Sequence, residues 1–149
     1  MENADRVRAN TAEEINRQID RGIEARVRDY AQRSESEITR RIDELGREWD
    51  MERLLETNAS ALAFTGLVLG ITRSRRWLIV PSIVLPFLFQ HAIQGWCPPV
   101  PIFRRLGVRT REEIDREKYS LKALRGDFEE IDSMRRSEET EDALEAVNA

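Results

Sequence analysis

The chain has 149 residues, of which 35% are charged and 40% are hydrophobic, and its formal net charge is −4. A single cysteine excludes an internal disulfide framework and any cysteine-only metal site. Acidic and basic residues are nearly balanced wherever they occur, so the sequence lacks the basic surface that neutralises phosphates, and we expect no nucleic-acid partner.

Charge is distributed very unevenly along the chain. Residues 1–58 hold 11 basic and 15 acidic side chains, and residues 104–149 hold 10 and 13. Residues 59–103 carry only three charges, all of them arginines within 73–76. This pattern predicts an all-α protein, in which a two-helix transmembrane hairpin is flanked by a long N-terminal amphipathic helix and a shorter C-terminal one. The first 50 residues contain no apolar run, so we expect no processed or exported N-terminus.

In the N-terminal arm we expect residues 1–10 to be flexible and residues 11–56 to form one amphipathic, coiled-coil-like helix. Thr11 and Glu14 have the spacing of a capping box, which favours a helix start. The apolar stripe of this helix comprises Ile15, Ile19, Ile23, Val27, Tyr30, Ser34, Ile38, Ile42, Leu45 and Trp49. Such a narrow stripe favours a partner helix, either the C-terminal arm or a second copy in a homo-oligomer. The alternative is a lone helix in solvent or on a membrane surface.

The first apolar segment, residues 57–72, is short for a membrane span. It corresponds to about 24 Å of helix, against a hydrocarbon thickness of about 30 Å. Small residues recur on one face of this helix, namely Ala59, Ala63, Gly66 and Gly70. This face predicts close packing on the second apolar segment, because small residues let helix backbones approach closely in lipid. A lipid-facing or intermolecular role is the alternative.

The second apolar segment, residues 77–96, has the length of a full span. Trp77 and Trp96 bracket it, as aromatic residues do at membrane interfaces. Pro81 and Pro86 predict a bend, and a re-entrant geometry remains open. Basic residues are more numerous beside the base of the hairpin than at its tip, so we expect a bacterial-type inner-membrane protein with both termini in the cytoplasm.

The hairpin unit is expected to cover residues 57–103, followed by a basic juxtamembrane segment and an amphipathic helix within 104–136. Thr110 and Glu113 repeat the capping-box spacing at the start of this helix. Residues 137–149 are acidic and are expected to be a disordered tail. Four arginines are predicted to contact lipid head groups: Arg104, Arg105, Arg109 and Arg111.

Few side chains suggest chemistry. Cys97 is the only thiol and a candidate reactive group, because nearby arginines would stabilise its thiolate. Gln90, His91 and Gln94 form a candidate polar face at membrane depth, with hydrogen bonding to a bent backbone as the alternative. No arrangement of residues predicts a catalytic, cofactor or metal site, so we expect a protein that is not an enzyme.

The segment from His91 to Pro98 resembles the YgaP-like transmembrane domain family, which has a Gly-x-Cys-Pro near the exit of its second helix. Gly95, Cys97 and Pro98 match that motif. The resemblance implies a two-helix bacterial inner-membrane module, and the fusion of some members to a rhodanese implies an association with sulfur transfer. Neither arm resembles a rhodanese, and no second cysteine is present to act as its nucleophile.

The leading hypothesis is a non-enzymatic integral membrane protein that acts as an oligomeric, membrane-anchored helical scaffold. One alternative is a sulfur-transfer or redox module that uses Cys97 together with a sulfur-transfer protein partner. The other alternative is a hairpin that deforms the bilayer.

Overall fold

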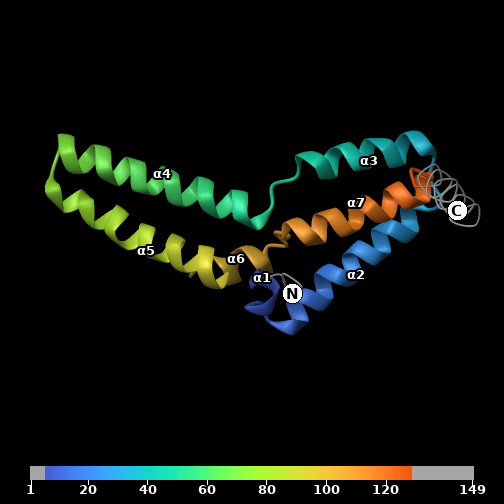
Figure 1. Cartoon of the computed structure of the whole chain (residues 1–149), viewed down its shortest axis with the longest axis horizontal. Helices are drawn as coiled ribbons and strands as arrows, with labels where there is room; N and C mark the ends of the chain where they lie inside the picture. Colours follow the sequence, from blue (N-terminus) through green and yellow to red (C-terminus); the bar gives the residue numbers. More distant parts are fainter. Residues whose placement is uncertain (1–5, 129–149) are drawn as a thin grey trace, which may run out of the picture.

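The computed structural model describes residues 6–128, and every regular element in that range is a helix, which confirms the all-α class. The elements are α1 Arg6–Ala9, α2 Glu13–Tyr30, α3 Glu35–Arg47, α4 Met51–Thr72, the 3-10 helix η1 Arg75–Leu78, α5 Ile79–Gln94, α6 Val100–Arg105 and α7 Arg111–Arg125. Figure 1 shows an elongated molecule, with α4 and α5 as a hairpin at one end and α2, α3 and α7 as a bundle at the other. The short helices α1 and α6 lie between the two parts.

The bundle is built around α7, which contacts both α2 and α3 (Figure 1). Its buried core contains Ile38, Ile42, Leu45, Ile114 and Leu121, with Tyr30 packed against them. The two predicted stripes therefore cover each other within one chain, which was one of the two partnerships that the sequence left open.

The expected single helix over residues 11–56 is wrong, because the chain turns twice within it. Ser34 does not continue the apolar stripe but forms a capping box with Glu37 at the start of α3. Asp50 begins α4, since its side chain accepts a hydrogen bond from the N–H of Arg53 at 2.8 Å. Both side chains supply acceptors to helix N–H groups that have no partner within the helix, so they start new helices.

The expected flexible N-terminus is wrong for residues 6–9, which form α1 and bury Val7 at 2% exposure. Residues 1–5 lie outside the described part. Thr11 does not cap α2, because its hydroxyl donates to the carbonyl of Val7 at 2.7 Å. The helix α2 begins at Glu13 without a side-chain cap.

Two helical stretches, Glu35–Thr72 and Arg75–Gln94, contain windows long and apolar enough to cross a membrane. The first comprises α3 and α4, and the second comprises η1 and α5. Only 17% and 11% of their most apolar windows are buried, whereas the core helix of a globular protein is mostly buried. The helix α5 continues through Pro86 and ends at Gln94, where Gly95 adopts a left-handed φ of 71°. The predicted second span thus ends two residues early, because such a glycine terminates a helix.

Two glycines of the predicted small-residue face pack on the second half of the hairpin. Gly66 and Gly70 are both buried, and a Cβ placed on Gly66 would lie 2.6 Å from Cδ of Pro81 and 2.9 Å from Cβ of Val80. In the structure, this face therefore packs within the hairpin at these two positions. Ala59 is half-buried, as is Ala63.

The helix of the C-terminal arm begins as predicted. Thr110 and Glu113 form the expected capping box of α7. The helix α7 ends at Arg125, since Gly126 takes a left-handed φ of 88°. Residues 129–136 of the predicted segment lie outside the described residues. The tail at 137–149 lies outside the described residues.

We predict that Gly66→Ala lowers the thermal unfolding midpoint of the protein in detergent micelles. Overpacking against the proline ring costs about 1–3 kcal/mol. Alanine stabilises a helix by about 1 kcal/mol relative to glycine, so helix propensity alone predicts a raised unfolding midpoint. Thr65→Ala, at an exposed neighbouring position, is the control and is expected to leave the midpoint within error. A raised midpoint for Gly66→Ala would contradict the packing.

Candidate functional site

The base of the hairpin is the place where α1, α4, α5 and α6 meet. A small apolar cluster joins α1, α4 and α6 to the loop after α5, and it consists of Val7, Met51, Leu55, Cys97 and Val100, with Phe103 and Val108 against it. The last carbonyls of α5 lack partners within the helix. Arg6 donates to the carbonyl of Ala92 at 2.6 Å, and Asn10 donates to that of Gln94 at 2.8 Å. The helix α1 thus closes the end of α5.

Beside this base, Glu113 of α7 forms a buried ion pair with Arg104 of α6. Glu113 is 2% exposed, and its carboxylate accepts two hydrogen bonds from Arg104 at 2.6 and 2.8 Å. Arg8 also donates to Glu113, and the N–H of Thr110 donates at 2.9 Å. Arg104 is itself 1% exposed, so both charges are removed from solvent.

One turn further along α7, Glu117 is fully buried and receives three arginines. Arg41 donates to it at 2.8 and 3.1 Å, and Arg26 donates at 3.0 Å. Arg109 forms the third pair with Glu117 and also donates to Glu48 at 2.9 Å. The backbone carbonyl of Arg109 accepts from the N–H of Met51 at 2.9 Å, so the same residue holds the start of α4.

The prediction that Arg104 and Arg109 contact lipid head groups is therefore wrong, because both side chains are buried in ion pairs with glutamates. The lipid contact was predicted from the charge and the position of these four arginines alone. Arg105 is exposed, as is Arg111, and for these two the lipid contact stays a prediction. The position of Glu113 and Glu117 on the apolar face of α7 could have indicated buried partners for these arginines.

The arginines lower the pKa of both carboxyl groups. Burial by itself raises the pKa of Glu113, but hydrogen bonds from Arg104 and Thr110 outweigh this effect, so the pKa lies below its usual value. Burial likewise raises the pKa of Glu117, and hydrogen bonds from Arg26 and Arg41 with the charge of Arg109 reverse the shift. Both glutamates are therefore anionic at neutral pH.

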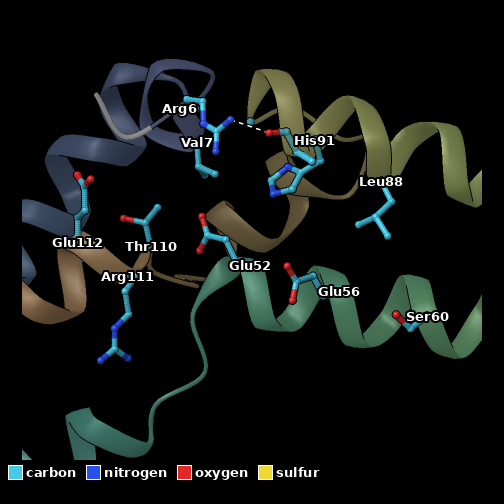
Figure 2. Close-up of a pocket in the computed structure, with 12 residues that line it drawn as sticks. Arg6, Val7, Glu52, Glu56, Ser60, Leu88, His91, Thr110, Arg111 and Glu112 are labelled. Carbon is cyan, nitrogen blue, oxygen red and sulfur yellow. Dashed lines mark hydrogen bonds between the residues drawn. The ribbon is translucent and has the colours of Figure 1, made fainter. Parts of the chain in front are cut away.

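A cleft of about 660 Å³ opens between the base of α4 and the end of α5. Its wall carries side chains of both charges, and Figure 2 shows their arrangement. The charged residues on it are Arg6, Glu52, Glu56, Arg111 and Glu112. The ring of His91 points from α5 towards Glu52 and Glu56 on α4 (Figure 2). His91 is 7% exposed, and its Nδ1 atom has no hydrogen-bond partner.

The predicted polar face is divided by the structure. Gln90 donates to the side chain of Gln94 at 3.3 Å, while His91 turns into the cleft. His91 also lines an apolar groove of about 380 Å³ between α4 and α5, together with Cys97. Among residues 6–128, no three His, Cys, Asp or Glu side chains form a group that could hold a metal ion.

Cys97 lies in a buried, apolar environment and not beside arginines, as its neighbours in the sequence had suggested. The thiol is 8% exposed, and burial raises its pKa, which disfavours the reactive thiolate. Arg104 was expected to stabilise that thiolate, but its guanidinium is bound to Glu113. No described contact gives Cys97 a catalytic role.

We predict that Glu117→Gln destabilises the bundle by about 3–5 kcal/mol, because the loss of one partner leaves arginine charges uncompensated in a buried place. Chemical denaturation followed by circular dichroism measures this change. Glu24→Gln is the matched control, since Glu24 forms an exposed pair with Arg28 that is worth under about 1 kcal/mol. Equal effects of the two substitutions would contradict the structural importance of Glu117.

We also predict that acid weakens the bundle through these glutamates. A carboxyl group with a lowered folded-state pKa contributes stability that is complete above its unfolded pKa of about 4.3. This stability is lost as the pH falls from there through the folded-state pKa. Denaturation midpoints measured from pH 7 to pH 3 are expected to fall steeply for the native chain and less steeply for Glu117→Gln. Parallel curves would refute the linkage.

No family model, no curated protein and no solved structure matches the chain. The resemblance to the YgaP-like transmembrane domain family therefore stays a prediction from the Gly95, Cys97 and Pro98 motif.

Proposed function

We propose that the protein is a non-enzymatic membrane anchor, in which the α4–α5 hairpin lies in a bilayer and holds the three-helix bundle at its surface. The observation that carries this proposal is the exposed apolar surface of the hairpin. The exposed side chains include Leu62, Phe64, Leu67, Ile71, Trp77, Ile79, Ile83, Leu85, Phe87, Phe89 and Ile93. Soluble monomers rarely expose contiguous apolar patches beyond a few hundred Å².

The bundle has the opposite character, which supports a boundary between lipid and water at the base of the hairpin. Exposed positions of α2 carry ion pairs such as Arg17 with Glu14 and Arg28 with Glu24. Such pairs are well solvated in water and costly in hydrocarbon. The apolar and charged surfaces thus belong to different parts of one elongated molecule (Figure 1).

A scaffold role is supported by the firm connection between these two parts. Arg109 joins the start of α4 to α7, and Arg6 joins α1 to the end of α5. The bundle is therefore held in a defined position on the hairpin rather than on a loose tether. The described chain begins in α1 at the base of the hairpin and ends after α7 in the bundle (Figure 1), and we propose that the bundle side faces the cytoplasm of a bacterial-type cell.

Homo-oligomerisation remains part of the proposal. The apolar stripes of the two arms do not require a second copy, because they pack on each other within one chain. A second copy would have to use other surfaces, such as exposed faces of the hairpin. The sulfur-transfer and membrane-deforming alternatives stay predictions from the sequence, since no described contact favours either one.

We predict that Leu85→Arg blocks stable membrane insertion. Leu85 lies in the middle of α5 and is 51% exposed. In a bilayer the arginine would cost about 2.5–3.5 kcal/mol, whereas on a solvated surface it would be neutral or improve solubility. Flotation of the expressed protein with liposomes after carbonate extraction measures insertion. A native chain that remains in the soluble fraction would refute the proposal.

Glu24→Arg supplies the matched control, because it adds positive charge to the exposed face of α2. It is expected to float as the native chain does. A Leu85→Arg variant that floats equally well would show that α5 does not lie in hydrocarbon.

A further inference from the structure

The cleft at the base of the hairpin combines both signs of charge with a buried, unpartnered nitrogen. Three carboxylates and two guanidinium groups line it, which makes its formal charge −1 when His91 is left out. A purely anionic ligand is disfavoured by this excess of carboxylates, and a ligand with one cationic group and one anionic group is complementary to the wall.

His91 supplies an independent indication of a ligand. Its side chain is more than nine-tenths buried, its Nδ1 has no hydrogen-bond partner, and its ring points into the cleft beside Glu52 and Glu56 (Figure 2). A buried polar atom without a partner costs free energy that a bound donor would recover. A primary ammonium group has three donors, enough for an imidazole nitrogen and two carboxylates.

The position of the cleft indicates which molecule would carry that ammonium group. Ser60 and Leu88 extend its wall along α4 and α5 towards the apolar part of the hairpin. Across His91 and Leu88 lies the apolar groove, whose lining includes Leu62 and Phe87. The acyl chains of a lipid whose head group lies in the cleft would leave it past Ser60 and Leu88, along the hairpin.

We propose that this cleft binds an aminophospholipid, with the primary ammonium group between Glu52, Glu56 and His91 and the phosphate between that group and the acyl chains. This inference rests on the proposed membrane anchoring, since the head group must approach from the bilayer. The surrounding carboxylates select the ammonium group by hydrogen bonds, so a trimethylated head group loses these contacts.

The test is native mass spectrometry of the full chain, released from micelles that contain equimolar phosphatidylethanolamine, phosphatidylcholine and phosphatidylglycerol with identical acyl chains. We expect phosphatidylethanolamine adducts to exceed each of the others about tenfold, which corresponds to roughly one charge-assisted hydrogen bond. The double variant Glu52→Gln with Glu56→Gln is expected to bind the three lipids equally. His91→Phe, which keeps a ring and removes the acceptor, is expected to reduce the preference.

Glu24→Gln is the control for loss of a carboxylate outside the cleft, and it is expected to keep the native preference. Equal binding of the three lipids by the native chain would overturn the inference, as would an unchanged preference in the double variant with native circular dichroism. Liposome flotation of the same samples separates this failure from failure of the anchor. A chain that floats without lipid preference refutes only the aminophospholipid site, whereas a chain that does not float refutes both.

Discussion

Two carboxylates one turn apart on α7, those of Glu113 and Glu117, hold the described part of the chain in one arrangement. They receive one arginine from each of five other segments: Arg8 of α1, Arg26 of α2, Arg41 of α3, Arg104 of α6 and Arg109 of the loop before α7. Buried ion pairs add little net stability, because desolvation offsets much of their attraction, but they disfavour arrangements that leave a charge unpaired. We infer that these pairs select one packing of the helices.

This selection matters because the apolar cores are small and separate. One lies within the bundle, around Leu45 and Ile114, and the other lies at the base of the hairpin, around Met51 and Val100. Apolar contacts are nondirectional, so two small cores joined by short loops would tolerate several relative positions. Arg109 removes this freedom, since its side chain pairs with Glu117 while its carbonyl accepts from Met51.

Sequence reasoning located the hairpin and the start of α7 because each has a local signal, an uncharged segment or a capping box. The break at Ser34 was not predicted, because Ser34 has the spacing of one more position on the same helix face. Its role as the N-cap of α3, in a capping box with Glu37, is possible only because α2 has already ended. Sequence reasoning also placed Arg104 and Arg109 at the lipid surface. Their true partners lie on α7, and Arg109 also pairs with Glu48, 61 residues away. The cleft beside His91 is lined by residues from both helices of the hairpin. It was not predicted either, because these residues are far apart in the sequence.

The charge pattern and the ion pairs together explain why the polar and apolar parts can share one short chain. Arginine stays charged at any ordinary pH, so Arg104 next to the proposed span would normally require water or head groups. Pairing with Glu113 allows it to be buried beside the apolar residues that follow α5. In the proposed membrane orientation, the chain can therefore pass from hydrocarbon to a folded bundle within a few residues. The same short transition places the carboxylates of α4 beside the last turn of α5, where a polar cleft meets an apolar groove at His91.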